Sequence, residues 1–153
     1  MHLQSKILVE QSIDQVTKFF YEPTSVAKWD RSVAEMIPTS SSGQAVGSTF
    51  DTIAPSGMRM NYEIVEFDSE RSVKIRLNNS KMFRTALWHF QFDPVGDKTE
   101  ITCNVFFTLR PRYLYLYPVL YFNRSALLRD LTFLKAALEE NYGVISVRSS
   151  SRG

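Results

Sequence analysis

The spacing of apolar residues changes once along this chain, and that change constrains the fold more than any other feature. From residue 49 to residue 110 apolar and polar residues alternate in short runs separated by turns, as in Val73, Ile75 and Leu77, which is typical of antiparallel strands. After Pro111 the pattern takes the period of a helix, with leucines at Leu120, Leu127, Leu131, Leu134 and Leu138. Several strands followed by one long helix predict an α+β fold.

The first 40 residues predict one strand and two short helices. Residues 2–10 alternate as a strand does, and Ser12 with Gln15 has the spacing of a capping box at a helix start. Pro23 interrupts that helix, and Thr24 or Ser25 can cap a second one that ends near residue 29. Further strands are expected at 33–39, 49–54, 58–67, 73–77, 82–92 and 99–110.

These elements predict a curved antiparallel sheet of about seven strands around a long C-terminal helix. A helix cannot fill the concavity of such a sheet along its whole length, so an internal pocket is expected beside it. The 11 Phe, 7 Tyr and 2 Trp of the chain suit a core or a pocket for a flat apolar ligand. Residues 1–143 are expected to form one ligand-binding domain, with Gly143 capping the last helix, Pro118 dividing the helical region and 144–153 a mobile tail.

Composition argues against several classes of protein. A net charge of +2, with basic residues scattered among acidic ones, does not point to nucleic acid or to an anionic membrane. One cysteine excludes an intrachain disulfide, and two histidines do not make a zinc site, so no metal or cofactor is expected. The sequence has no apolar stretch of signal-peptide or membrane-spanning type, which favours a cytoplasmic protein, either monomer or homodimer.

Five segments occur in an order that resembles the START-like, or SRPBCC, superfamily with its helix-grip fold. They are ILVEQSIDQVTKFFYEPTSVAKWD at 7–30, GSTF at 47–50, YEIVEFDSERSV at 62–73, WHFQFDPVGDKTEIT at 88–102 and LKAALEE at 134–140. The chain is most similar to the polyketide cyclase/dehydrase-like group. That resemblance implies enzymes without metal or organic cofactor that fold a reactive polyketide and position acid, base and water. Other members of the superfamily only bind or carry lipids, sterols or hormones.

Three residues are candidates for catalysis. Alternation along 82–92 places Arg84 on the apolar face, where its guanidinium could stabilise an enolate or carboxylate oxygen. Asp30 could act as a general base at the pocket rim, and Tyr62 could move a proton within the pocket. His89 falls on the solvent face, although a register shift of one residue would exchange it with Arg84. Each of these residues could equally be solvated or structural.

The ligand-binding candidates are large apolar or aromatic side chains on the predicted pocket face and near its entrance. They are Trp29, Met60, Trp88, Phe90, Tyr113, Tyr117 and Tyr121. Cys103 lies between Ile101 and Val105 on a strand and is interpreted as a small buried apolar residue.

Three functional hypotheses follow. The first is a cofactor-independent, polyketide cyclase-like enzyme of secondary metabolism that closes a ring by aldol, dehydration or lactone chemistry. The second is a non-enzymatic binding or transfer protein for a lipid, sterol or aromatic metabolite. The third is an interaction module that uses outward-facing apolar residues of the sheet such as Leu8 and Phe106.

Overall fold

Antiparallel pairing joins seven strands into one sheet in the order β1-β7-β6-β5-β4-β3-β2 in the computed structural model, which describes residues 1–41 and 43–142. The strands are β1 His2–Val9, β2 Glu35–Pro38, β3 Thr49–Ile53, β4 Arg59–Asp68, β5 Ser72–Asn78, β6 Phe83–Val95 and β7 Lys98–Leu109. The helices are α1 Ile13–Phe20, α2 Val26–Trp29, α3 Tyr117–Phe122 and α4 Ser125–Tyr142, with 3₁₀ helices η1 Pro23–Ser25 and η2 Pro111–Leu116. The predicted α+β, helix-grip architecture is confirmed.

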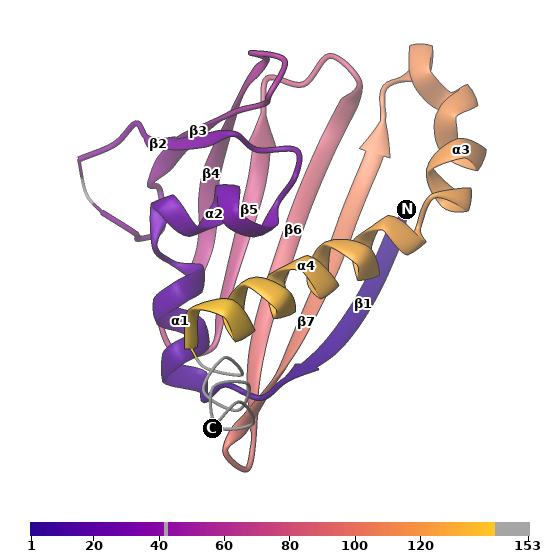
Figure 1. Ribbon diagram of the computed structural model, residues 1–153. Helices are drawn as coiled ribbons and strands as arrows, with labels where there is room; N and C mark the ends of the chain where they lie inside the picture. Colours follow the sequence, from indigo (N-terminus) through magenta and orange to yellow (C-terminus); the bar gives the residue numbers. More distant parts are fainter. Residues whose placement is uncertain (42, 143–153) are drawn as a thin grey trace.

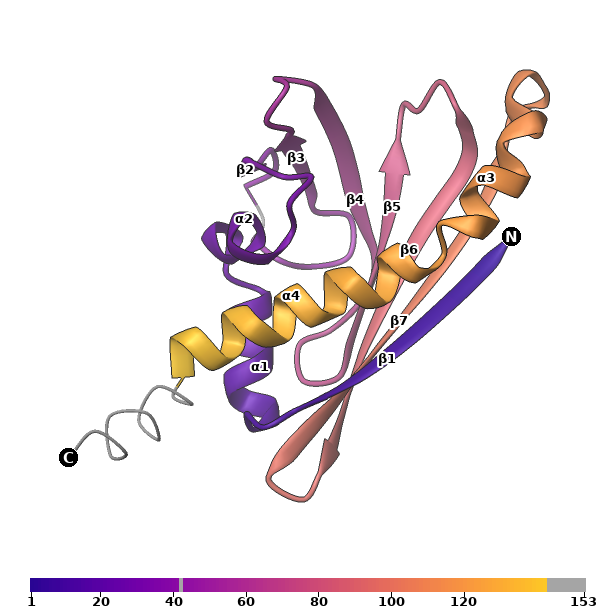
Figure 2. The ribbon, with the colours of Figure 1, turned by 45° about the vertical axis from the view of Figure 1, so that its right-hand side comes forward.

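The sheet curves around α4, which runs diagonally across its concave side (Figure 1). Figure 2 shows α1 and α2 on this same side, between the end of α4 and the edge formed by β2 and β3. The concave side is therefore covered by helices of two origins, one group from the start of the chain and one from its end. The expected tail at 144–153 and the expected cap Gly143 lie outside the described residues.

Local chemistry fixes where the first helix begins. The backbone N–H of Gln15 donates to the Ser12 hydroxyl at 3.3 Å, and the Ser12 N–H donates to the Gln15 side chain at 3.2 Å. This reciprocal pair is the predicted capping box. The predicted cap of the second helix is wrong in its chemistry, because Ser25 does not cap α2 with its side chain. Its hydroxyl donates backwards to the Glu22 carbonyl at 2.8 Å.

The core lies between α4 and the concave face of the sheet, and α4 lies closest to β1. Leu131, Leu134 and Leu138 are fully buried, which confirms the helical stripe expected from the sequence. The matching set on β7 consists of alternate residues, Ile101, Cys103, Val105, Phe107 and Leu109, each less than a tenth exposed. Cys103 is thus the small buried residue that its position predicts.

A β-bulge changes the phase of β6 near its start. Phe83 pairs with Leu109 and Thr85 with Thr108, so Arg84 is an extra residue between the two pairs. Beyond the bulge Ala86 and Phe90 point inward and are buried, whereas Arg84 is exposed. The expectation that Arg84 shares the inward face of its strand is therefore wrong. Strict alternation along β6 fails at this one position.

The helical region after Pro111 breaks twice. Pro118 lies in the first turn of α3, where its missing N–H and fixed φ cost nothing, and η2 precedes it as the sequence predicts. A second break, at Asn123 and Arg124, separates α3 from α4. Asn123 ends α3 with two hydrogen bonds to the Val119 carbonyl, one from its side-chain amide at 2.8 Å and one from its backbone N–H at 3.1 Å.

Two leucines of α4 provide a test of this core. Leu134→Ala should lower the free energy of unfolding by ~2–5 kcal/mol, because it removes a fully buried side chain and leaves a cavity. Leu128→Ala is the matched control on the same helix, where the side chain is 48% exposed, and should change stability by less than ~0.5 kcal/mol. Urea denaturation of the two variants measures both values. Equal losses would contradict the assignment of this face of α4 to the core.

Candidate ligand-binding site

A cavity of about 280 Å³ lies between α1, α2, α4 and the concave face of β2–β6. This volume is near the lower end of the range of ~300–1,000 Å³ typical of small-molecule sites. Thirteen of its lining residues are apolar or aromatic, namely Phe20, Tyr21, Val26, Trp29, Val33, Met36, Phe50, Tyr62, Ile64, Val73, Ile75, Trp88 and Phe90. The other five are Asp30, Ser32, Gln44, Thr52 and Asp130. The cavity is thus apolar with a few polar groups.

Ring contacts between different elements hold the aromatic wall. Phe50 of β3 stacks on Tyr62 of β4 with ring centroids 5.3 Å apart, and Tyr62 meets the edge of Trp88 of β6 at 5.8 Å. On the helical side Phe20 of α1 contacts Phe90 at 4.8 Å. These offset and edge contacts fix the ring orientations before any ligand enters, which favours a flat ligand that stacks on them.

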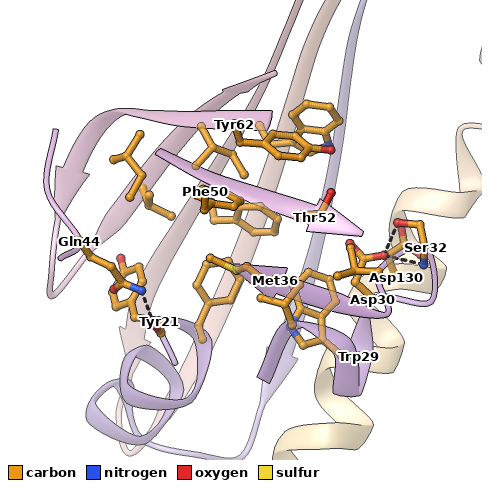
Figure 3. Close-up of a pocket in the computed structure, with 18 residues that line it drawn as sticks. Tyr21, Trp29, Asp30, Ser32, Met36, Gln44, Phe50, Thr52, Tyr62 and Asp130 are labelled. Carbon is orange, nitrogen blue, oxygen red and sulfur yellow. Dashed lines mark hydrogen bonds between the residues drawn. The ribbon is translucent and has the colours of Figure 1, made fainter. Parts of the chain in front are cut away.

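The turn after α2 fixes the Asp30 carboxylate. Its Oδ1 accepts hydrogen bonds from the Ser32 backbone N–H at 3.0 Å and from the Ser32 hydroxyl at 2.6 Å. This is a side-chain-supported turn of the kind that aspartate favours. Figure 3 shows the result, with the Asp30 carboxylate held near Asp130 of α4. The second carboxyl oxygen of Asp30 remains available to a molecule in the cavity.

Asp130 is a site residue that the sequence predictions missed. Burial, followed by the nearby Asp30 carboxylate, raises its pKa above the ordinary value for aspartate, and the adjacent Arg129 opposes this rise. One signal was present in the sequence. Asp130 lies three residues after Leu127 and four before Leu134, so it interrupts the apolar stripe of α4 with an acid.

Tyr62 contributes a phenol to the same region. Burial raises its pKa, the negative charge of Asp30 adds to that rise, and the neighbouring Thr52 hydroxyl works against it. Tyr62 therefore stays protonated at neutral pH and acts as a hydrogen-bond donor or acceptor. Asp30, Asp130 and Tyr62 are thus three titratable groups that line one largely apolar cavity.

One polar atom of the cavity wall, Nε1 of Trp29, has no hydrogen-bond partner among residues 1–41 and 43–142. It belongs to a residue that is 7% exposed. A buried polar group without a partner costs about 1–3 kcal/mol. Because this nitrogen is itself enclosed by the wall, a ligand reaches it only if neighbouring side chains move.

The structure brings five of the predicted site residues together around the cavity, Trp29, Asp30, Tyr62, Trp88 and Phe90. Met60 lies on the same sheet face, because it pairs with Thr52, but it does not line the cavity. Arg84 is exposed at its bulge and also lies outside the cavity.

The three predicted tyrosines of the helical region lie elsewhere. Tyr117 stacks on Phe107, and its hydroxyl accepts a hydrogen bond from the Leu109 N–H at 3.0 Å. Tyr113 packs against the core, and Tyr121 is 48% exposed. None of the three lines the cavity, because α3 continues beyond the end of β7 and away from α2. The expected entrance at this segment is not where the structure places the cavity.

The remaining titratable candidates do not contribute to the cavity. His89 lies on the outer face of β6 beside Lys74 and Asn104, and burial followed by the Lys74 charge lowers its pKa. Burial raises the pKa of the Cys103 thiol, which keeps it protonated and unreactive. No group of three or more His, Cys, Asp or Glu residues within the described part of the chain is arranged to hold a metal ion.

A family model described as "Polyketide cyclase / dehydrase and lipid transport" matches residues 1–139. The chain belongs to this family. Its members share the START-like fold, and family and cavity together support a ligand-binding protein. A comparison with curated protein sequences gave no match.

Solved structures show the same fold at low identity. A START superfamily protein from Mycobacterium smegmatis has a TM-score of 0.72 at 12% identity, covering 91% of this chain and 97% of that one. Norcoclaurine synthase from Thalictrum flavum, solved in complex with dopamine and hydroxybenzaldehyde, has a TM-score of 0.70 at 12% identity, covering 94% and 88%. The Aha1 dimer from Colwellia psychrerythraea has 0.70 at 16%, covering 94% and 99%. At these identities the likeness shows the fold alone.

The Asp130 environment makes a prediction about stability and pH. The folded state raises the pKa of Asp130, so this residue does not lower the free energy of unfolding below the ordinary aspartate pKa of 3.8. As the pH rises from there through the raised pKa, the charged form becomes costly in the folded state and the free energy of unfolding falls. Asp130→Asn should therefore be more stable than the wild type at neutral pH, with the difference disappearing in acid. Urea denaturation at both pH values measures this. In an Asp30→Asn background the gain should shrink, because the neighbouring charge is gone.

Proposed function

We propose that this protein is a cofactor-free, polyketide cyclase-like enzyme that acts on a compact hydrophobic substrate in the cavity. The observation that carries the proposal is the convergence of Asp30, Asp130 and Tyr62 on an otherwise apolar, aromatic cavity. An acid with a raised pKa beside a second carboxylate is a common arrangement for paired acid and base roles. Family membership and the low-identity neighbours are consistent with this reading and do not decide it.

Ring closure by an aldol step assigns one role to each carboxyl group. The Asp30 carboxylate takes a proton from a substrate carbon that lies between two carbonyl groups. The resulting enolate carbon then attacks the carbon of another carbonyl group further along the same substrate chain. The oxygen of that carbonyl takes the proton of Asp130 as the new carbon–carbon bond forms. Asp30 then holds a proton and Asp130 lacks one, so transfer between the two neighbouring carboxyl groups restores the starting state.

The cavity wall supplies orientation. The Tyr62 hydroxyl can donate to a carbonyl oxygen of the substrate, and the rings of Trp88 and Phe90 hold its apolar part. Holding two reacting carbons of one flexible chain in contact is a large part of catalysis for such a reaction.

The charge of the cavity restricts the substrate. Among the described residues its lining includes Asp30 and Asp130 but no lysine, arginine or histidine. An anionic group at this end of the ligand would meet two acids, and Arg129, the cation that acts on Asp130, does not itself line the cavity. We therefore expect a ligand that is neutral or cationic where it approaches Asp30 and Asp130.

A non-enzymatic carrier is the second candidate. It is favoured by one specific observation: Arg84, the residue expected to stabilise an enolate, is outside the cavity, and no other cation replaces it there. The family description also includes lipid transport. A carrier would bind its ligand by the same aromatic wall and release it chemically unchanged.

Tryptophan fluorescence tests ligand binding, because both tryptophans of the chain, Trp29 and Trp88, line the cavity. We expect 2-naphthol and 2-naphthylmethylamine to quench this emission at lower concentration than 2-naphthoate. A like charge at contact distance costs ~1 kcal/mol even at the dielectric constant of water, so naphthoate should bind at least about fivefold more weakly. The Asp30→Asn/Asp130→Asn variant should reduce this discrimination. Tighter binding of naphthoate than of naphthol would contradict the charge argument.

Turnover distinguishes the enzyme from the carrier. Native mass spectrometry followed by denaturing extraction identifies the co-purifying molecule, which is then offered to the protein together with its open-chain precursor. For an enzyme, Asp130→Asn should lower turnover by ~10²–10⁴-fold while binding persists. Arg84→Gln is the matched control and should retain turnover, because its side chain lies outside the cavity. A ligand that binds tightly and is never converted by the wild type would favour the carrier.

A further inference from the structure

Residues 110–129, here called the aromatic segment, form a second feature that the cavity does not explain. The segment contains η2, α3 and the first turn of α4, and it protrudes beyond the end of β7 in both views (Figures 1 and 2). Six large apolar side chains in it are exposed, namely Leu114, Tyr115, Val119, Tyr121, Phe122 and Leu128. Tyr115 is 70% exposed and Phe122 is 78% exposed. Other exposed large apolar residues of the described chain are scattered singly, whereas these six fall within 15 residues, from Leu114 to Leu128.

The opposite side of the segment is anchored. Tyr113, Leu116, Tyr117 and Leu120 pack against the core, and the Tyr117 hydroxyl accepts the Leu109 N–H at 3.0 Å. The exposed residues are therefore presented by a helical scaffold with one partly buried and one open face. Such amphipathic helices bind at an interface between water and an apolar phase.

All charged residues of the aromatic segment are positive. It carries Arg110, Arg112, Arg124 and Arg129, and the chain has no Asp or Glu from residue 101 to residue 129. None of these four arginines forms an ion pair with another residue of 1–41 or 43–142. The Arg124 guanidinium lies over the Tyr121 ring at 4.3 Å, and Arg110 donates to the Ser80 carbonyl at 3.2 Å. Both contacts leave the positive charge without a counter-ion.

These observations favour one kind of partner. A second copy in a symmetric contact would place Arg112 and Arg124 against the arginines of its partner, with no acid in the segment to offset them. An anionic bilayer instead offers phosphates to the arginines and an interfacial layer to the tyrosines and Phe122. No described helix is long and apolar enough to cross a bilayer, so any such contact is peripheral.

We propose that the aromatic segment docks this protein on the surface of a membrane rich in anionic lipid. Val119 and Phe122 enter the interface, and Arg112 and Arg124 lie at the level of the phosphates. The cavity is a separate feature, so this inference does not depend on whether the protein is an enzyme or a carrier.

Vesicle co-sedimentation of the full chain tests the proposal, using phosphatidylcholine vesicles with and without phosphatidylglycerol. The wild type should sediment with the anionic vesicles only, and high salt should release it, because at ~1 M salt the Debye length falls to about 3 Å. Arg112→Gln/Arg124→Gln should weaken binding about fivefold for each arginine. Val119→Gln/Phe122→Gln should weaken binding more than about tenfold, because two apolar side chains no longer enter the interface.

Met58→Gln/Val95→Gln is the matched control, because these side chains are 62% and 50% exposed outside the aromatic segment, one just before β4 and one at the end of β6. It should sediment as the wild type does. Thermal melts and 2-naphthol quenching, unchanged in all variants, show that the fold and the cavity survive. Absence of sedimentation with anionic vesicles would overturn the proposal, as would equal losses in the two apolar variants. So would a concentration-dependent dimer that only Val119→Gln/Phe122→Gln dissociates, without vesicle binding.

Discussion

The packing of the leucine face of α4 on the concave side of the sheet organises the rest of the molecule. Leu131, Leu134 and Leu138 are completely buried in one core cluster with Val9 of β1 and the inward residues of β7, and α4 lies closest to β1. This contact fixes α4 across the concave sheet at an angle that leaves the β3–β5 side uncovered (Figure 2). The α1 and α2 region closes over that side, and the space left between it and α4 is the cavity. The cavity is thus a consequence of how α4 crosses the sheet and where α1 and α2 cover the rest of it.

The same helix places chemistry at the edge of the core. Asp130 follows Arg129 and precedes the buried Leu131, so its carboxyl group is held at the boundary between core and cavity. An acid in this position costs stability at neutral pH, since burial and Asp30 both disfavour its charge. A structural role would be served better by an apolar residue, which is the reason to interpret Asp130 as functional.

Much of the fold could be predicted from the sequence because its signals are local. The capping box at Ser12, the alternation in β5 and the leucine stripe of α4 each depend on residues within one element. The cavity residues from α2, β4 and β6 were found for the same reason, since alternation and helix ends place their side chains. The positions of Arg84 and Asp130 depend on more than their own element. A bulge is set by pairing with the next strand, and the meeting of Asp30 with Asp130 joins residues a hundred positions apart.

The net charge of the whole chain hides a local excess of positive charge. A value of +2 over the whole chain does not suggest an anionic partner, yet residues 101–129 contain arginines and no acid. All the acids that offset them in the total charge lie outside these residues. An electrostatic surface acts within about a Debye length, ~8–10 Å, so the local imbalance governs what the segment attracts. Cavity and segment therefore carry opposite charge, and their ligands should differ accordingly.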